Sequence, residues 1–479
     1  MDTALVYANF ANELSFDKLP PELVDLTKRL VLDELGVMLV GSSQESVRTL
    51  FAAACDWGGK PEASILLHPH RLPAHNAALV NGTMGRAYDY DALHEASVVH
   101  ATAGAVPQCL VMSERRGNVS GREFITALVT GMEFMIRLGL SFKESFLHTG
   151  RVTSVHATTL GGALACAKLL KLNPSKIVST FGLAFTQIGG NLQNVKEGTM
   201  LAQVQQGFAG QAGVLSATMA AAGLRGPERV FQGEFGYFMS YHDGQYDADA
   251  LTRDLGERYE LQDISIKYYP CCFCSHYANE AMLDLVREHK ISAEAIDAID
   301  VKVTRGIYNL VCTPINAKRD SRTTQEALFS LPHTVAAAAV HGEVKLRHMS
   351  EEGINDPSVR ELARKVSVLM DERLEQERGH ELGFSIVSVR LKNGDQFERR
   401  VDTVKGHPAK PMTFDDCFEK LEECVAFADL EIEDSKLSGL VERIHELDRV
   451  ADITKVLIEP FSDVRRRHAA GPAARASVS

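Results

Sequence analysis

Apolar positions recur at helical spacing through most of the first half of the chain. The segment from Pro21 to Gly41 is predicted to form one helix, because proline is favoured in the first helical turn and glycine where a helix ends. Two later segments, residues 155–172 and 207–224, keep this spacing and are rich in Ala, Gly, Ser and Thr. Since small side chains let helices approach closely, both are predicted to be buried central helices.

The spacing changes to that of β-strands in the second half of the chain. Apolar and polar residues alternate over residues 299–304, which predicts a strand. A second alternating segment, residues 387–391, leads into Asn393 and Gly394. Asn-Gly between two strands is typical of a two-residue hairpin turn, so a hairpin is expected there.

A mixed α+β segment is therefore expected over about residues 265–405, with a helix over 324–340 between its strands. Helical spacing returns at Thr413, where a carboxylate three residues later at Asp416 completes a capping motif. The last residues, 465–479, begin with three arginines and continue in Ala, Gly, Pro and Ser, which predicts a disordered tail. The fold class is expected to be mainly α.

Composition removes several functional classes. The chain has 479 residues, a formal net charge of −12 and 24% charged residues. This acidic balance argues against nucleic acid as a partner, and an anionic substrate would need cations gathered locally. No secretory signal and no apolar run of transmembrane length are recognised, so no membrane association is expected. Nine cysteines, an odd number in a long chain, favour a reducing cytoplasm over a disulfide framework.

The densest group of titratable residues lies between Tyr88 and His100. Two carboxylates, Asp89 and Asp91, and two imidazoles, His94 and His100, fall within twelve residues. A carboxylate orients an imidazole and raises its basicity, which suits proton transfer to or from carbon. Two alternatives remain open: these residue types also bind divalent metals, and aspartates in a solvated loop often only cap the backbone.

Lys267 is the centre of a second candidate segment. It lies among apolar and aromatic residues, and a partly desolvated lysine acts as a base or binds a carboxylate. The alternative is a lysine that extends to solvent from the end of a strand. Cys271, Cys274 and His276 follow, but a structural zinc site needs a second pair of ligands, and none is recognised elsewhere in the sequence. Nucleotide-binding and serine-hydrolase motifs are also not found.

These segments resemble the MmgE/PrpD family of 2-methylcitrate dehydratases and cis-aconitate decarboxylases. The run from Asp89 to His94 followed by His100 is similar to the family's acidic motif, and Lys267 to Cys272 is similar to its Lys-x-Tyr-Pro-Cys-Cys motif. Residues 326–332 are similar to a further family segment. The resemblance extends over most of the chain and keeps the order of the motifs.

The resemblance implies a large all-helical domain with an inserted α+β lid. Residues 1–264 and 406–464 would form the helical domain and residues 265–405 the lid. It also implies a homodimer that needs no organic cofactor and no metal. The reactions known for the family are dehydration, decarboxylation and epimerisation of small di- and tricarboxylates.

The residue assignments follow the family motifs position by position. Asp89, His100 and Lys267 match family active-site positions and are expected to be catalytic. Four further residues are expected to bind the substrate: Asp91, His94, Gln203 and His276.

Two positions depart from the family pattern, since a family histidine falls on Val152 and a family lysine falls on Ala202. A charged hydrogen bond contributes about 1.5–3 kcal/mol, so losing the lysine is expected to weaken tricarboxylate binding tenfold or more. A substrate with fewer carboxylates, or a reaction that only moves protons, is easier to reconcile with these changes. The residues considered as replacements are His148, Arg151, His156 and Lys196.

Three functions are therefore compared. The first is a cofactor-independent lyase, a dehydratase or decarboxylase, that acts on a small di- or tricarboxylate by proton transfer alpha to a carboxylate. The second is an epimerase of a small dicarboxylate, with His100 and Lys267 as bases on opposite faces of one carbon. The third, motivated by Val152 and Ala202, is a carboxylate-binding protein that has lost catalysis.

Overall fold

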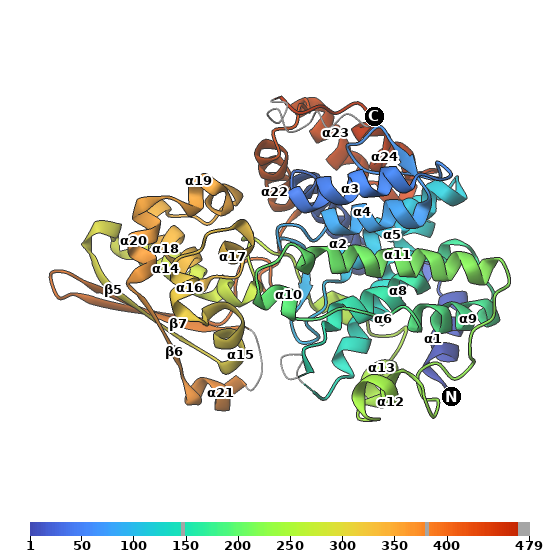
Figure 1. Cartoon of the computed structure of the whole chain (residues 1–479), viewed down its shortest axis with the longest axis horizontal. Coiled ribbons are helices and arrows are strands. Elements are labelled where there is room, and N and C mark those ends of the chain that lie inside the picture. Colours follow the sequence, from blue (N-terminus) through green and yellow to red (C-terminus); the bar gives the residue numbers. More distant parts are fainter. Residues whose placement is uncertain (145–148, 379–382, 468–479) are drawn as a thin grey trace.

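The computed structural model describes residues 1–144, 149–378 and 383–467. The chain is mainly α-helical and forms two bodies, a large helical one and a smaller one that contains a four-stranded sheet (Figure 1). The predicted fold class is confirmed. Among the residues described, no helix is both long and apolar enough to cross a membrane.

The large body is built from helices of the first half of the chain. They are α1 Thr3–Glu13, α2 Pro21–Gly41, α3 Glu45–Trp57, α4 Ala74–Met84, α5 Ala101–Arg116, α6 Gly121–Leu140, α8 Thr153–Leu169, α9 Pro174–Phe185, α10 Gln193–Lys196, α11 Leu201–Ala221, α12 Tyr237–His242 and α13 Ala248–Thr252. The predicted helix Pro21–Gly41 is confirmed at both ends.

The two segments rich in small residues are α8 and α11, and both lie centrally, as predicted. Helix α8 is buried along nearly its whole length and packs on α5, α6 and α11. A Cβ atom on Gly161 of α8 would lie 2.8 Å from the backbone oxygen of Gly131 in α6. The close approach of these two helices therefore depends on glycine.

The C-terminal helices return to the large body, where α22 packs on α2 (Figure 1). These helices are α22 Phe414–Phe427, α23 Asp434–His445 and α24 Thr454–Leu457. The capping box predicted at Thr413 and Asp416 is confirmed, since each side chain accepts a hydrogen bond from the other residue's backbone N–H. The disordered tail expected over residues 465–479 stays a prediction, although its first residues form backbone hydrogen bonds: the backbone oxygen of Arg465 accepts from the N–H of Glu431, and the N–H of Arg467 donates to the backbone oxygen of Asp429. Residues 468–479 lie outside the described residues.

The smaller body surrounds one four-stranded sheet with the strand order β6-β5-β7-β8. Its elements are α14 His276–His289, β5 Ile296–Val303, α15 Arg305–Ile307, α16 Ile315–Arg319, α17 Thr324–Leu328, α18 Leu331–His341, α19 Glu351–Ile354, α20 Pro357–Arg364, β6 Val366–Met370, α21 Glu372–Arg378, β7 Ser385–Leu391 and β8 Gln396–Val401. Strand β5 pairs parallel with β6 and antiparallel with β7, and β7 pairs antiparallel with β8. Both predicted strands and the hairpin at Gly394, which has φ +94°, are confirmed.

The helical character predicted over residues 324–340 is confirmed, but the structure divides it into two helices, α17 and α18. The chain leaves helical geometry at Phe329, and Ser330 caps α18 by accepting a hydrogen bond from the His333 N–H. Pro332 lies in the first turn of α18, where its missing N–H costs nothing. Apolar spacing runs through the break, which explains why periodicity alone did not find it.

Each body has its own buried apolar core. Leu93 belongs to the core of the smaller body although its neighbours in sequence belong to the larger one, and Leu346 shows the reverse. The exact boundaries at 264/265 and 405/406 stay a prediction. The exchange of residues shows that the segment around Leu93 lies where the two bodies meet.

Candidate active site

The two candidate segments of the sequence meet at this junction through a short antiparallel ladder. Strand β3, Leu93–His94, pairs with β4, Ile264–Ser265. Lys267 lies just after β4 and Asp89 just before β3, so the antiparallel pairing brings them together. The Lys267 ammonium donates to the backbone oxygen of Asp89 at 2.7 Å and lies 3.1 Å from its carboxylate oxygen Oδ2.

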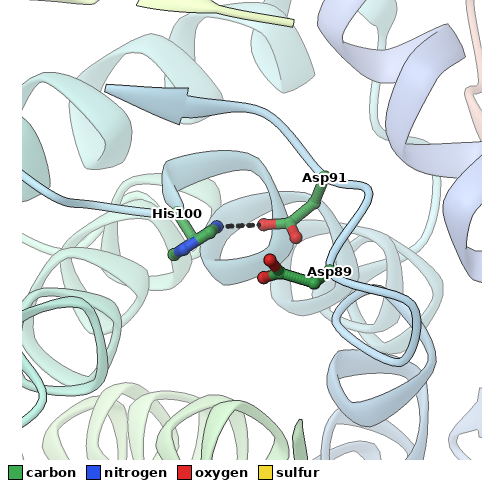
Figure 2. A group of neighbouring side chains, drawn as sticks. All are labelled: Asp89, Asp91 and His100. Atoms are coloured by element: carbon green, nitrogen blue, oxygen red, sulfur yellow. Dashed lines mark hydrogen bonds and ion pairs between the residues drawn. The ribbon is translucent and has the colours of Figure 1, made fainter. Parts of the chain in front are cut away.

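Asp89, Asp91 and His100 converge in one buried cluster (Figure 2). The Nδ1 of His100 lies 2.8 Å from Oδ2 of Asp91. Arg86, which sequence reasoning missed, lies among all three. Its Nη1 forms ion pairs with both aspartates, 3.1 Å from Oδ1 of Asp91, and its Nη2 lies 2.9 Å from Nε2 of His100. Because Arg86 only donates, Nε2 carries the lone pair of the ring and Nδ1 carries the proton given to Asp91.

The charges of this cluster follow from burial and from the neighbouring cations. Burial by itself raises the pKa of the Asp91 carboxyl, but Arg86 and His100 outweigh it and hold that pKa well below its ordinary value. Burial also raises the pKa of Asp89, and Arg86 and Lys267 outweigh it in the same way. Burial and then Arg86 lower the pKa of His100 although Asp91 opposes them. At neutral pH the site therefore holds two carboxylates and a neutral imidazole.

Lys420 of α22 joins the segment that contains Asp89 and Asp91 to the segment that contains Lys267. Its buried ammonium donates to the backbone oxygens of Tyr90 at 2.7 Å and Lys267 at 2.8 Å, and it pairs with Asp33 of α2 at 2.6 Å. The backbone at Asp89 has φ +50°, a left-handed conformation that aspartate adopts more readily than most residues. A special backbone conformation held by several contacts is typical of functional sites.

The cluster faces a pocket between the two bodies that encloses about 880 Å3 of space, part of it open to solvent. Of the predicted site residues, Asp89, His100, Lys267 and Gln203 line this pocket. Gln203 of α11 donates its side-chain amide to the side-chain oxygen of Gln325 in α17. This hydrogen bond joins the two bodies across the pocket.

The same three residues also form a metal-ligand geometry, because their donor atoms lie within 4.8 Å of one another. Arg86 already contacts all three, and Lys267 contacts Asp89. These two cations balance the charge of the two carboxylates, which a divalent ion would otherwise neutralise. The residues fit a hydrogen-bonded acid–base cluster better than a metal centre, and the absence of a metal from the reaction stays a prediction.

The arrangement of the two bodies agrees with the comparison to known families. Residues 6–248 match the MmgE/PrpD N-terminal domain, and residues 269–443 match the MmgE/PrpD C-terminal domain. The chain belongs to the MmgE/PrpD family. The resemblance proposed from the sequence motifs is thereby confirmed.

Relatives in the family are similar along nearly their full length. The chain is 27% identical over 470 residues to the cis-aconitate decarboxylase-like protein oryM of Aspergillus oryzae, covering 94% of this chain and 95% of that protein. It is 25% identical over 472 residues to a cis-aconitate decarboxylase of Aspergillus terreus, covering 94% of each. It is 27% identical over 434 residues to the human cis-aconitate decarboxylase, covering 86% of each. These MmgE/PrpD relatives support a lyase-type function.

Val152 and Ala202, which the sequence motifs predict to depart from the MmgE/PrpD pattern, both line the pocket. The departures themselves stay a prediction. Arg151, His156 and Lys196 are not among the described residues that line the pocket, and His148 lies outside the described residues. Arg151, His156 and Lys196 therefore do not supply a charge to the pocket at Val152 or Ala202.

The cationic side chains that line this MmgE/PrpD pocket, among the residues described, are Arg86 and Lys267. Arg86 lies three residues before Asp89 and five before Asp91. This position shortly before the acidic motif was the one feature of the sequence that could have indicated Arg86. Nothing in its local sequence distinguishes it from an ordinary surface arginine. Only the fold of residues 86–100 shows that its guanidinium turns back onto the motif.

Three residues expected to bind substrate are not among those that line the pocket. Asp91 is fully buried behind His100. His94 is held through Nδ1 by the Ser97 hydroxyl at 2.9 Å, and burial lowers its pKa to about 4. The Nε2 of His276 lies 3.3 Å from the backbone oxygen of Cys271, and burial together with nearby Lys267 lowers its pKa to about 3. A substrate-binding role for these residues stays a prediction.

Proposed function

We propose that this chain is a cofactor-independent lyase that acts on a small di- or tricarboxylate by proton transfer alpha to a carboxylate. The observation that carries the proposal is a neutral His100, oriented by Asp91 and placed in a pocket with Arg86 and Lys267. A neutral imidazole with a carboxylate on Nδ1 is the usual form of a histidine base. The family and the decarboxylase relatives support the lyase class.

In a dehydration, Nε2 of His100 takes the proton from the carbon alpha to a carboxylate. The electron pair of that C–H bond forms the double bond, the C–O bond breaks, and the hydroxide leaves as water after accepting a proton from the Lys267 ammonium. In a decarboxylation, the C–C bond to CO2 breaks and its electron pair is delocalised toward a remaining carboxylate. The carbon then accepts a proton from the Lys267 ammonium, which regains a proton from solvent.

Arg86 and Lys267 are proposed to hold the substrate carboxylate next to this base. Nη2 of Arg86 contacts Nε2 of His100, so a carboxylate that binds Arg86 is placed within reach of the imidazole. Cations that stabilise the negative charge that develops on a carboxylate during the reaction lower its barrier. Asp89 fixes Lys267, and Asp91 fixes the ring of His100.

The epimerase and binding-protein alternatives make different demands on the same residues. An epimerase needs two bases on opposite faces of one carbon. Here His100 contacts Asp91 and Lys267 contacts Asp89, so both candidate bases lie on the side of the two neighbouring aspartates. A binding protein needs only the cations. The retained and oriented His100 favours the lyase.

One experiment separates the three functions. The enzyme is incubated in D2O with a panel that includes cis-aconitate, 2-methylcitrate and smaller dicarboxylates, and the mixture is followed by proton NMR. A new alkene or the loss of CO2, abolished in His100→Gln and Lys267→Met, is the expected result. Deuterium at a stereocentre without loss of water or CO2 would show the epimerase instead. Thermal stabilisation by a carboxylate without any turnover would show the binding protein.

A homodimer and a cytoplasmic location also belong to this proposal. Met200, Leu201 and Phe208, at and near the start of α11, are exposed large apolar residues that a second copy of the chain would bury. Light scattering of the purified chain tests the dimer. The nine cysteines are free thiols, which agrees with a reducing compartment.

A further inference from the structure

The wall of the active-site pocket has a polar part and an apolar part. The polar part contains the charged side chains of Arg86, Asp89 and Lys267, the neutral imidazole of His100, and the uncharged residues Thr153, Ser154, Gln203, Gln205, Gln206 and Gln325. The larger part is apolar. On the side of the helical body it contains Val152, Val155, Leu192, Val195 and Ala202, and on the side of the smaller body it contains Phe273, Leu310 and Phe329.

The apolar wall includes the two positions that the sequence motifs predict to depart from the family pattern. Val152 and Ala202 give this pocket apolar surface where the motif resemblance implies histidine and lysine. Leu192, the N-cap residue of α10, and Val195, within α10, extend this surface. An apolar wall gains free energy from apolar ligand atoms and gives no hydrogen bond to a carboxylate.

The charge balance of the pocket also favours a ligand with few carboxylates. The two cations Arg86 and Lys267 are already paired with the two carboxylates Asp89 and Asp91, and His100 is neutral. The cluster therefore carries no net positive charge. A ligand with three carboxylates would bring charges that this pocket cannot match, whereas one or two carboxylates can be shared between Arg86 and Lys267.

A second cavity adjoins the pocket along its apolar side. The two share the apolar residues Leu192, Val195, Leu310 and Phe329, together with Gln325, in their linings, so the apolar wall reaches the second cavity. The rest of the second cavity is more polar and includes Lys196, Glu197, Lys318 and Glu326. The second cavity lies between α10 of the helical body and α16 and α17 of the smaller body, where Figure 1 shows the two bodies facing each other. The shared wall gives an elongated ligand room beyond the catalytic cluster.

We infer that the substrate is a carboxylate with an alkyl chain, whose carboxylate head lies at Arg86 and Lys267 and whose chain lies along Val152, Leu192 and Val195 toward the second cavity. This inference rests on the proposed function for the place of the head group. It adds a substrate class to that function: an alkyl-substituted mono- or dicarboxylate in preference to a compact tricarboxylate.

Binding of non-reactive analogues tests the inference apart from catalysis. The probes are succinate and 2-methyl-, 2-ethyl-, 2-propyl- and 2-butylsuccinate, which have no hydroxyl to lose, and propane-1,2,3-tricarboxylate is the compact competitor. Titration calorimetry is expected to show a Kd that falls roughly fourfold per added methylene, or about 60-fold from methyl to butyl. The tricarboxylate is expected to bind more weakly than butylsuccinate.

Variants locate the effect on the proposed wall. Val152→Thr, nearly equal in volume, and Leu192→Asn are expected to reduce the gain in affinity per methylene. Ala202→Lys is expected to strengthen tricarboxylate binding. Val441→Thr, on α23 away from the pocket, is the matched control and should keep the wild-type slope.

The outcomes distinguish the inference from the function on which it rests. A Kd that does not depend on chain length, or a tricarboxylate that binds more tightly than butylsuccinate, overturns the inference even if the enzyme turns over a compact acid. A clear chain-length slope that is lost in Val152→Thr and Leu192→Asn upholds it. That result would stand even if no lyase activity were found, in which case the proposed function alone would fail.

Discussion

The Nδ1 atom of His100 lies 2.8 Å from Oδ2 of Asp91, and both side chains are buried, with His100 lining the pocket between the two bodies and Asp91 behind it. Asp91 fixes the tautomer of the ring, so the lone pair is on Nε2, where it accepts a hydrogen bond from Arg86. This pair explains why two residues nine positions apart in the sequence act as one chemical unit.

Asp91→Asn tests the orienting role of this carboxylate. Asparagine keeps the volume but lacks the charge that stabilises a protonated imidazole, so kcat is expected to fall by about 100- to 10,000-fold. The measurement is steady-state turnover of the substrate found by NMR. Asp17→Asn, which removes a surface ion pair with Arg122, is the control and should keep full activity. Equal kcat in Asp91→Asn and wild type would contradict the role of Asp91.

Arg86→Met tests the charge balance of the cluster. The variant leaves Asp89 and Asp91 buried without their shared cation, so the free energy of unfolding at neutral pH is expected to drop by about 3–5 kcal/mol. Urea unfolding measures it, and Arg122→Met at the surface should cost far less.

The loss of unfolding free energy in Arg86→Met is expected to depend on pH. In the wild type the folded pKa values of Asp89 and Asp91 are depressed, so their contribution is present above the unfolded value of about 3.9 and is lost as pH falls through the folded values. In Arg86→Met their burial raises the folded values, so charged carboxylates become a penalty that protonation relieves. The deficit should shrink as pH is lowered toward about 4, and a deficit independent of pH would contradict the assignment.

The activity should depend on pH through His100. Burial and Arg86 lower its pKa, so kcat/KM is expected to stay level on the acid side down to below the ordinary histidine value of about 6.5 and then to fall. The lowered pKa of His100 also affects the free energy of unfolding. The unfolded chain protonates this histidine more readily than the folded protein does, so the protein loses stability as pH falls below the unfolded pKa of the group. His100→Gln should lose only the part of this acid limb in stability that His100 contributes, because His94 and His276 also have lowered pKa values, whereas His70→Gln, at an exposed position, should keep the whole limb. An acid limb centred above the ordinary histidine value would exclude His100 as the neutral base.

Lys267→Met tests the carboxylate-binding role of the buried ammonium. One charged hydrogen bond contributes about 1.5–3 kcal/mol, so the Kd of succinate is expected to rise by about 10- to 150-fold. Calorimetry measures it. Lys196→Met, whose side chain lines the second cavity and not the catalytic pocket, is the control. If both variants bound succinate as the wild type does, Lys267 would have only a structural role.

The hydrogen bond between Gln203 and Gln325 is expected to couple the two bodies. In a double-mutant cycle with Gln203→Leu and Gln325→Leu, the two single changes should not add, and a coupling energy of about 1 kcal/mol in the free energy of unfolding is expected. Additive effects within error would mean that the two side chains do not interact across the pocket in solution.

The sequence by itself determined the features that local chemistry controls. Pro21 and Gly41 mark the two ends of α2, and Gly394 forms the hairpin because its positive φ suits that turn. Thr413 caps α22 with its own neighbours in the chain. The family motifs also identified Asp89, His100 and Lys267, and the structure places all three at one pocket.

Only the tertiary structure decided how these residues act. Arg86 and Lys420 have no distinctive sequence context. The role of Arg86 comes from the way residues 86–100 fold back onto its guanidinium, and the role of Lys420 comes from contacts with residues more than a hundred positions away. His94 and His276 were equally plausible by residue type, but their local partners hold them away from the pocket lining. A side chain's type sets which chemistry it can perform, whereas its direction and the charges around it depend on packing between distant segments, which local sequence patterns do not encode.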